Sequence, residues 1–416
     1  MTKALLKNKG EVEMGIFEAM AGQNLDTVSF IHDFKTGKVR TKPKIRIPKQ
    51  YEFIKKVLKT RGGGHEKMVF HYNPKVNLKA IVAIHDSLLG IPLGGTRMRN
   101  DYENEEAAII DAADLAEGMS NKGFWAGTGT SGGKIVIMGD PVIDKTREFL
   151  AAYADFLERF AGQIITGEDM NISSADCSIA AQRTKYITGA REKSGDPSPK
   201  TAYGVLLGIK AAMKLLWDDS SFRDITVAVK GITGKVGSNL AQYLADEGAN
   251  LIGSYWEHEK GGREKAEEIA KKLGVKIVAD KDIFSQKYNI LSLNAIGKEL
   301  NERTIPQIPK GTIIGGAANN QLADPRDYWG DTLFKKGIWY LPDFVLNAGG
   351  VINVSDELEK GGYSEKRSLK KIEVVGLNIP WILNISRAQK ISPHRIADML
   401  PRLFIKEARQ RKYKIK

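Results

Sequence analysis

The sequence has a single cysteine, Cys177, among its 416 residues. An intramolecular disulfide is therefore impossible, which is typical of a reducing compartment. The chain also lacks any apolar run of about 18 residues, the length that a transmembrane helix needs. Its first residues, MTKALLKNKGEVEMG, contain no apolar stretch of the kind found in a signal peptide. We therefore expect a cytoplasmic protein that does not bind membranes.

Acidic residues are scarce in two segments, and these account for the formal net charge of +13. Residues 35–61 contain eleven Lys or Arg and one acid, and residues 406–416 contain six and one. A groove for nucleic acid usually combines basic residues with several aromatic ones. Residues 35–61 offer only Tyr51 and Phe53. We interpret the segment as solvated basic surface, with nucleic-acid binding as the alternative.

The length suits two domains. Residues 66–90 alternate apolar and polar side chains, which predicts paired strands, and residues 103–121 have helical spacing. From Thr201 onward, helices alternate with short apolar strands, which indicates a parallel sheet covered on both faces. We predict an α/β fold with an N-terminal α/β substrate domain built on a mixed sheet, and a Rossmann-type domain. Residues 29–40 loosely resemble residues 69–80, and we favour chance slightly over duplication of a strand pair.

A glycine turn follows the predicted strand ITVAVKG and precedes a predicted helix. Its spacing is Gly231-x-x-Gly234-x-x-Gly237. Glycines there let the backbone approach a dinucleotide, and the helix N-terminus offers amide donors to a pyrophosphate. The acid that usually binds the ribose is replaced by Tyr255, so NAD and NADP both stay open. Cations that would meet a 2′-phosphate, or are surface charges, are Lys230, Lys235, His258, Lys260 and Arg263.

Two lysines, Lys122 and Lys134, lie in the glycine-rich segment GMSNKGFWAGTGTSGGKIVIMGDP. A phosphate-binding P-loop is excluded, because GxxxxGK[ST] would need Gly at Thr128 and a hydroxyl at Ile135. Both lysines adjoin glycine and apolar residues, which predicts that their side chains are at least partly buried. Burial and a neighbouring cation lower the pKa of a lysine, which suits it to act as a base near neutral pH.

Several motifs in order resemble the Glu/Leu/Phe/Val dehydrogenase family, most closely its leucine and phenylalanine dehydrogenases. They run from about His65 to the C-terminus: LKAIVAIHD, LGGTRM, the two-lysine segment, TGEDM, SPKTAYGV, the glycine turn, GAANNQLADP and PDFVLNAGGVINV. The resemblance implies four segments: a basic extension (1–64), a substrate-binding and dimerisation domain (65–200), a dinucleotide domain (201–350) and C-terminal helices packing back towards the first domain (351–416). It also implies a homo-oligomer.

The resemblance further implies NAD(P)-dependent oxidative deamination of an amino acid to its 2-oxo acid and ammonia, and the reverse reaction. Lys134 is then the base that activates water, Asp169 handles protons at the substrate nitrogen, and Lys122 binds the substrate carboxylate. Other substrate residues implied are Leu93, Gly94, Gly95, Met119, Gly167, Asn319, Asn347, Val351 and Val354. The implied cofactor residues are Thr201, Gly231, Thr233, Gly234, Lys235, Val236, Gly237, Tyr255, Ala295, Ile296, Gly297, Asn319 and Asn320. No metal is implied.

Leu93 bears on the substrate side chain. Glutamate dehydrogenases have a lysine at this place, and a leucine cannot pair a carboxylate whose burial is costly. An apolar substrate is therefore expected, either branched or aromatic; Gly167 leaves room for a large side chain.

Phe124 and Trp125 depart from the small residues usual in the family. They are expected to reshape the pocket, to pack against the N-terminal extension, or to signal altered activity. The alternative to an enzyme is a binding or assembly protein on a dehydrogenase scaffold.

Overall fold

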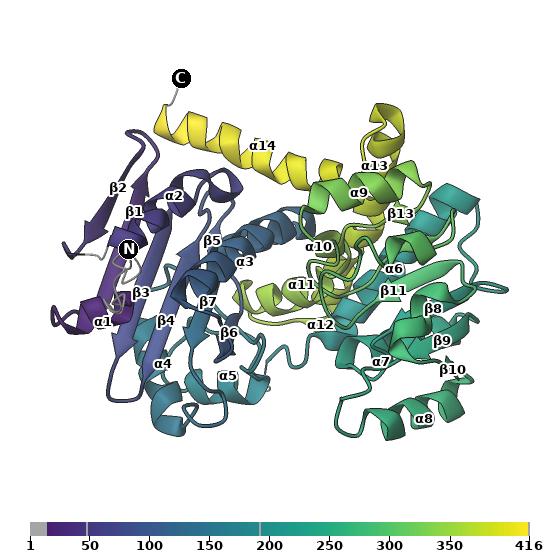
Figure 1. Cartoon of the computed structure of the whole chain (residues 1–416), viewed down its shortest axis with the longest axis horizontal. Coiled ribbons are helices and arrows are strands. Elements are labelled where there is room, and N and C mark those ends of the chain that lie inside the picture. The colour runs from purple at the N-terminus through teal and green to yellow at the C-terminus, as the bar shows by residue number, and fades with distance from the viewer. Residues whose placement is uncertain (1–14, 47–48, 191–192, 415–416) are drawn as a thin grey trace, which may run out of the picture. The chain divides into compact units, whose positions relative to one another are not determined.

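The computed structural model describes residues 15–46, 49–190 and 193–414 (Figure 1). It divides into two compact units. Unit 1 comprises Met1–Ser120, Thr130–Arg191 and Ile405–Lys416, and unit 2 comprises Asn121–Gly129 and Glu192–Phe404. Within the described ranges, no helix has the length and apolarity needed to cross a membrane.

Unit 1 contains a mixed sheet, as predicted. Its strands are β1 (Thr27–Asp33), β2 (Lys38–Lys42), β3 (Lys67–Asn73), β4 (Leu78–Ile84), β5 (Ile91–Leu93), β6 (Thr96–Arg99) and β7 (Thr130–Met138). The order is β2-β1-β3-β4-β7-β5, with β6 also pairing with β7. Neighbouring strands from β2 to β7 are antiparallel, whereas β5 and β6 run parallel to β7.

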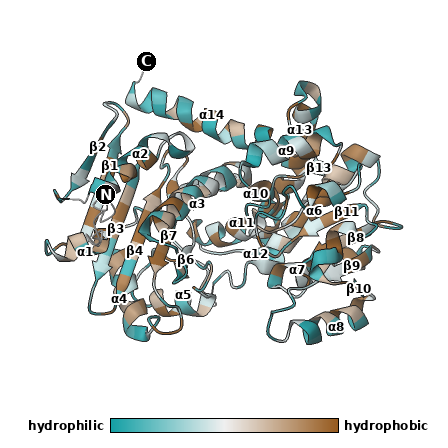
Figure 2. Cartoon of the chain, viewed as in Figure 1, coloured by the Kyte–Doolittle hydropathy of each residue, from teal (hydrophilic) through white to brown (hydrophobic). Residues whose placement is uncertain are grey.

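Helices cover both faces of this sheet because side chains of a strand alternate between its faces. On β3, Met68 and Phe70 pack towards α1 (Ile16–Ala21), α2 (Phe53–Thr60) and α3 (Glu105–Ala126). Val69 packs on the other side, with α4 (Arg147–Arg159) and α5 (Ser174–Ala180). Figure 2 shows the resulting hydrophobic strands β3, β4 and β7 inside the layer.

The N-terminal residues extend the sheet. β1 and β2 form an antiparallel hairpin, as β3 and β4 do, and β1 pairs with β3. The likeness between residues 29–40 and 69–80 therefore extends to the backbone, which favours duplication of a strand pair over chance.

Unit 2 contains a parallel six-stranded sheet in the order β10-β9-β8-β11-β12-β13. The strands are β8 (Thr226–Lys230), β9 (Asn250–Ser254), β10 (Lys276–Ile277), β11 (Ile290–Leu293), β12 (Ile313–Ile314) and β13 (Trp339–Tyr340). Numbered by sequence within this unit, the order is 3-2-1-4-5-6, that of a dinucleotide-binding Rossmann sheet. The predicted α/β fold, with a mixed sheet followed by a Rossmann-type sheet, is confirmed.

The helices of unit 2 cover this parallel sheet and extend the chain to its end. They are α6 (Ser198–Trp217), α7 (Lys235–Asp246), α8 (Gly262–Leu273), α9 (Arg326–Lys335), α10 (Asp343–Leu346), α11 (Gly349–Ser355), α12 (Glu365–Ile372), α13 (Val374–Gln389) and α14 (Pro393–Tyr413), whose last residues belong to unit 1. α6 shows why the sequence folds this way. Val205, Ile209 and Ala212 recur at helical spacing and are fully buried, and the helix ends at Asp218 in the left-handed conformation.

Candidate functional site

Unit 1 brings Lys134 and Asp169 together. Lys134 lies in β7 opposite Ala83, and its side chain is only 6 % exposed. Its Nζ donates a hydrogen bond of 2.7 Å to Oδ2 of Asp169. Asp169 lies in a tight loop, in which its backbone exchanges hydrogen bonds with that of Ile172. Two residues that lie 35 positions apart in the sequence thus form one buried ion pair.

Arg97 is a third member of this cluster, and sequence reasoning missed it. Its Nε donates to Oδ2 of Asp169 at 3.0 Å, while its Nη1 lies 3.2 Å from Asp111. The hydroxyl of Tyr102 donates to the same Asp111 carboxylate at 2.6 Å. The available signal was its place in LGGTRM, one of the motifs that carry the family resemblance.

The electrostatics of this cluster lower the pKa of Lys134 and keep Asp169 ionised. Burial lowers the pKa of Lys134, and the Arg97 guanidinium lowers it further, although the Asp169 carboxylate acts in the opposite direction. Burial alone would raise the pKa of Asp169, but the two cations hold it well below its ordinary value. The cluster therefore holds a lysine of lowered pKa beside a fixed negative charge.

Glycines hold the backbone close to this cluster. A Cβ on Gly94 would lie 1.8 Å from the carbonyl oxygen of Gly133 and 3.2 Å from Cγ of Met119. A Cβ on Gly95 would lie 2.3 Å from the carbonyl oxygen of Glu168, next to Asp169. Any side chain at either glycine would force these backbones apart.

Leu93 and Gly167 lie in the same part of unit 1. Leu93 ends β5 opposite Gly132, forms a bridge with Ile165, and is only 2 % exposed. The carbonyl of Gly167 accepts a hydrogen bond of 2.9 Å from the N–H of Thr96. Five of the predicted substrate residues, Leu93, Gly94, Gly95, Met119 and Gly167, are thus gathered in unit 1 with Lys134 and Asp169.

Lys122 belongs to unit 2, where it contacts Asn319, which in turn is hydrogen-bonded to Asn347. It lies in the last turns of α3, and its Nζ donates to Oδ1 of Asn319 at 3.2 Å. The same Oδ1 accepts a hydrogen bond of 2.9 Å from Nδ2 of Asn347. Oδ1 of Asn347 is buried and has no hydrogen-bond partner in the part of the chain that the structure describes. This amide is therefore available to a donor of a ligand.

Asp343 is a further residue that sequence reasoning missed near Lys122. Burial raises the pKa of its carboxyl, whereas the Lys122 ammonium and the backbone N–H groups of Asn320 and Phe344 act to lower it. Asp343 begins α10 within the quoted motif PDFVLNAGG, so a signal was present in the sequence.

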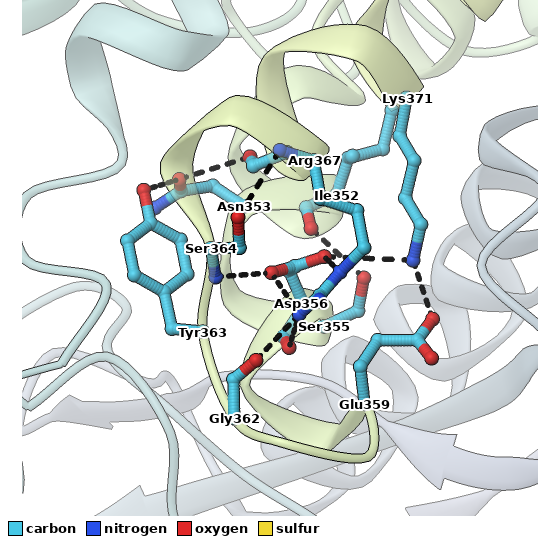
Figure 3. A network of polar contacts seen from close by, with 11 residues as sticks. Ile352, Asn353, Ser355, Asp356, Glu359, Gly362, Tyr363, Ser364, Arg367 and Lys371 are labelled. Atoms are coloured by element: carbon cyan, nitrogen blue, oxygen red, sulfur yellow. Dashed lines mark hydrogen bonds and ion pairs between the residues drawn. The ribbon is translucent and has the colours of Figure 1, made fainter.

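Val351 and Val354 lie three residues apart on α11 and are both half-buried. The network in Figure 3 fixes the end of this helix. Asp356, fully buried, accepts hydrogen bonds from Arg367 at 2.6 and 2.7 Å and from the N–H of Ser364 at 2.7 Å. Asn353 accepts from the hydroxyl of Tyr363 at 2.8 Å. α11, which carries the two valines, is thus anchored through polar contacts of Asn353 and Asp356.

The predicted glycine turn joins β8 to α7. Gly231 has φ +76°, a conformation that side chains disfavour, and Gly234 is the N-cap of α7. A Cβ on Gly237 would lie 2.1 Å from the carbonyl oxygen of Gly231. The three glycines therefore make the turn, begin the helix and allow helix and turn to pack closely, despite the extra residue. The N–H groups of Lys235, Val236 and Gly237 open α7.

Predicted cofactor residues from other strands lie near this turn. Cβ of Ala295, which follows β11, would be 2.9 Å from a Cβ on Gly231. Ile296 is 67 % exposed next to it, and a Cβ on Gly297 would lie 2.6 Å from the carbonyl oxygen of Asn319. Asn320 has φ +54° in the same loop. These features lie at the carboxyl ends of the parallel strands, where a dinucleotide binds in this kind of sheet. The close backbone, the exposed apolar side chain of Ile296 and the N-terminus of α7 all suit such a ligand.

Thr201 is almost fully buried in α6, and its hydroxyl donates to the carbonyl of Pro197 at 3.0 Å. A Cβ on Gly350 would lie 2.6 Å from this hydroxyl, so α6 and α11 pack closely there. Its predicted contact with the cofactor stays a prediction.

Lys230 is not a solvent-facing cation. Its side chain is 3 % exposed and pairs with Asp280 and, at 3.2 Å, with Glu299. Ser254, at the end of β9, donates to the other oxygen of Asp280 at 2.9 Å. Lys235 lies 3.5 Å from Asp196, and Arg263 3.1 Å from Glu267. Lys230 is therefore occupied by carboxylates, which argues against its proposed contact with a 2′-phosphate.

Glu259 is an acid near the glycine turn that sequence reasoning did not single out. Its Oε2 accepts a hydrogen bond from the hydroxyl of Thr233, and its Oε1 lies 3.2 Å from Nζ of Lys265. Tyr255, the residue at the usual position of the ribose acid, is half-buried beside it, with its ring 3.1 Å from a Cβ on Gly262.

Phe124 and Trp125 pack into the core of unit 2. The indole N–H of Trp125 donates to the carbonyl of Ala397 at 2.9 Å, and its ring lies 5.8 Å from that of Trp381. The ring of Phe124 lies 5.6 Å from that of Phe404. Their bulk thus serves packing against α13 and α14.

Known proteins resemble this chain over most of its length. A model of the Glu/Leu/Phe/Val dehydrogenase dimerisation domain matches residues 68–193. Leucine dehydrogenase of Bacillus subtilis is 43 % identical over 349 residues, which are 83 % of this chain and 93 % of that protein. The chain belongs to the Glu/Leu/Phe/Val dehydrogenase family. It is an amino-acid dehydrogenase, an oxidoreductase that acts on a CH–NH2 group and uses a nicotinamide cofactor.

A tryptophan dehydrogenase has a similar sequence and a similar fold. L-Tryptophan dehydrogenase of Nostoc punctiforme is 39 % identical over 351 residues, 84 % of this chain and 96 % of that protein. Its crystal structure superimposes with a TM-score of 0.71 and covers 86 % of this dehydrogenase and 99 % of that chain. The described residues contain no cluster of His, Cys, Asp and Glu suited to a metal ion.

Proposed function

We propose that this dehydrogenase catalyses oxidative deamination of an apolar L-amino acid to its 2-oxo acid and ammonia, and the reverse reductive amination. The hydrogen-bonded pair of Lys134 and Asp169 carries the proposal. A buried lysine with a lowered pKa next to an ionised carboxylate suits proton transfer from water near neutral pH. We assign the substrate's reacting carbon and nitrogen to unit 1 and the dinucleotide to unit 2.

Each residue then has one task. A nicotinamide supplies the hydride acceptor for oxidation at Cα of the substrate. The oxidised substrate is an iminium ion, to which water adds while Lys134 takes a proton from that water. Protonated Lys134 then returns this proton to the carbinolamine nitrogen, which Asp169 holds through its negative charge. Lys134 next takes the proton of the hydroxyl as the C=O bond forms, the C–N bond breaks and ammonia leaves. Lys122 binds the α-carboxylate as a charge-assisted hydrogen-bond donor, and Arg97 fixes Asp169 and keeps it ionised.

The apolar substrate class is supported by Leu93. Its side chain cannot form an ion pair with the γ-carboxylate of glutamate. Burying a carboxylate without a partner costs several kcal/mol. Similar proteins include leucine, tryptophan and valine dehydrogenases, whose names give apolar amino acids as substrates.

Charges near the glycine turn support one of the two cofactors. Glu259 contacts Thr233 of the turn, and Asp280 lies at the carboxyl end of the strands with Ser254. A carboxylate is the usual partner of a free ribose hydroxyl and would repel a 2′-phosphate. Because Lys230 already balances the charge of Asp280, Glu259 carries this argument. We therefore propose NAD as the preferred cofactor over NADP.

The test is a matrix of reaction rates. Leucine, valine, isoleucine, phenylalanine, tryptophan and glutamate are each supplied with NAD and with NADP, and absorbance of the reduced nicotinamide is followed. We expect reduction of NAD with at least one apolar amino acid and none with glutamate. Activity with glutamate would contradict the role of Leu93, and a higher kcat/KM with NADP would contradict that of Glu259. No activity with any pair from a folded protein would favour the non-catalytic alternative.

A further inference from the structure

Two segments at the N-terminus have the same backbone plan. β1 (Thr27–Asp33) and β3 (Lys67–Asn73) have bounds 40 residues apart, and so do the starts of β2 (Lys38) and β4 (Leu78). Both hairpin turns use a residue with positive φ at the equivalent place, Gly37 at +65° and Asn77 at +53°. One hairpin thus repeats the other.

The helices before the hairpins repeat as well. α1 buries Ile16, Ala19 and Met20, and α2 buries Ile54, Val57 and Leu58, with the same spacing. The N–H of Leu25 donates to the carbonyl of Met20 at 2.9 Å, and the N–H of His65 donates to that of Leu58 at 2.8 Å. Leu25 and His65 are again 40 residues apart, whereas the buried helix positions are 38 apart, because the connection after α2 is two residues longer than that after α1. We call residues 15–42 the first copy and residues 53–84 the second copy.

The two copies pair with two-fold symmetry. In the pairing of β1 with β3, Ser29 lies opposite Val69, which is the equivalent residue of the second copy. The other pairs are arranged symmetrically about this central pair. Two flanking hydrogen bonds are reciprocal: the N–H of His32 donates to Glu66, at 3.0 Å, and that of Tyr72 donates to Asp26, at 2.8 Å. The equivalent rings Phe30 and Phe70 meet edge to face, 5.6 Å apart. Each helix packs on the first strand of the other copy.

This is the geometry of a two-fold contact between identical chains, in which residue i meets j and j meets i. A second β3 in place of β1 would lie with Val69 opposite Val69, in the same register. The family's dimerisation domain matches from residue 68, within β3, and the first copy precedes that match. We propose that the first copy is an internal partner, which occupies in cis the edge of β3 through which a second copy of this chain would otherwise dimerise.

The outer edge of the first copy is strand β2, whose residues disfavour pairing with a further strand. β2 carries Lys38, Arg40 and Lys42 and is followed by Pro43, whereas the equivalents of the three basic residues in β4 are the buried Leu78, Ala80 and Val82. No described strand pairs with the outer side of β2. Figure 2 shows the residues of β2 as largely hydrophilic. Lysine and proline on an edge strand oppose pairing with another chain. The basic charge of this segment thus acquires a structural role that requires no nucleic acid.

The test uses cysteines at the centre of symmetry in the full-length chain. The hydrogen bonds at His32 and Tyr72 make Ser29 and Val69 a non-hydrogen-bonded pair, whose Cα atoms are about 4.5 Å apart in an antiparallel ladder. That spacing suits a disulfide. We therefore compare S29C/V69C, S29C and V69C after mild oxidation, by non-reducing electrophoresis and by analytical ultracentrifugation. The native Cys177 is buried in every variant.

We expect S29C/V69C to form a disulfide within one chain, so that its electrophoretic mobility changes without dimer formation. We expect neither single variant to cross-link. A V69C dimer would show that the edge of β3 meets a second copy, and a cross-linked dimer of S29C/V69C alone would show that the first copy is exchanged between chains. Either result overturns the proposal. A homo-oligomer formed through other surfaces leaves these cross-links unchanged, and none of the readouts depends on catalytic activity.

Discussion

Oδ2 of Asp169 accepts hydrogen bonds from Nζ of Lys134 at 2.7 Å and from Nε of Arg97 at 3.0 Å. Both donors are cationic side chains that lie mostly out of solvent. Arg97 can satisfy the carboxylate when Lys134 gives up its proton, because a guanidinium stays protonated in proteins. The arrangement thus lets Lys134 cycle between its charged and neutral forms without leaving Asp169 unpaired.

Replacing Lys134 by alanine should abolish most turnover, because it removes the proton acceptor. A positioned base contributes roughly 10² to 10⁴ in rate, so we expect kcat to fall by about that factor in steady-state assays. In the wild type, kcat should rise with pH and level off below the ordinary lysine pKa, because burial lowers the pKa of Lys134.

Lys210→Ala is the control for Lys134→Ala, since it breaks an ion pair with Glu247 elsewhere in the molecule. It should leave kcat unchanged. A Lys134→Ala enzyme that keeps most of its turnover would show that another group activates water.

Replacing Lys122 by alanine should weaken substrate binding more than turnover. A charge-assisted hydrogen bond contributes about 1.5–3 kcal/mol, which is about a 10- to 100-fold rise in KM for the amino acid. Binding of reduced cofactor, followed by its fluorescence, should change little. Lys214→Ala, which removes an exposed partner of Asp218, is the control. An unchanged KM together with a lower kcat would argue against a carboxylate contact.

Glu299 should make stability depend on pH in the opposite direction from most carboxylates. Burial raises its pKa from 4.5 to about 7, although the Lys230 ammonium acts to lower it. Between these values the folded state binds a proton that the unfolded state has lost. The free energy of unfolding therefore falls as pH rises through this range, by up to about 1.4 kcal/mol per pH unit from this group.

Glu299→Gln should remove that decline, because glutamine stays neutral. Urea unfolding between about pH 5 and pH 8 measures the slope for the wild type, for Glu299→Gln and for the exposed control Glu302→Gln. Equal slopes for the wild type and Glu299→Gln would place the titration at another residue.

A contact in the fold or the candidate site could be predicted from the sequence when its residues are close along the chain. Gly231, Gly234 and Gly237 are close in sequence, so the turn and its helix were predictable. Arg97 was not, because its approach to Asp169 depends on β6 running parallel to β7 and on a loop 72 residues away.

The internal repeat was also hard to recognise from letters. Its copies share a backbone, but equivalent side chains face different surroundings. Lys38 lies on an outer edge where Leu78 lies in a core, and Ser29 replaces the buried Val69. The burial of each position determines which residue type is suitable there. The two copies therefore differ in sequence although their backbone hydrogen bonds are equivalent.

Replacing Asp356 by asparagine should destabilise the segment that carries Val351 and Val354. The change keeps the shape but removes the charge that Arg367 contacts at two oxygens (Figure 3). Removing one partner of a fully buried ion pair lowers the free energy of unfolding by about 3–5 kcal/mol. Because Arg367 is partly exposed to solvent, we expect a smaller loss of roughly 2 kcal/mol. Asp218→Asn, in an exposed pair with Lys214, should cost far less.

The pH dependence of this Asp356 contribution has a defined sign. Burial alone would raise the pKa of Asp356, but hydrogen bonds from Arg367 and the N–H of Ser364 lower it below 3.8. Its stabilisation is therefore complete above the ordinary aspartate pKa and is lost as pH falls below it. Denaturant unfolding of wild type and Asp356→Asn at neutral pH and at about pH 3 should show the difference shrinking in acid. A difference that does not change with pH would mean that packing, and not the charge of Asp356, holds α11 in place.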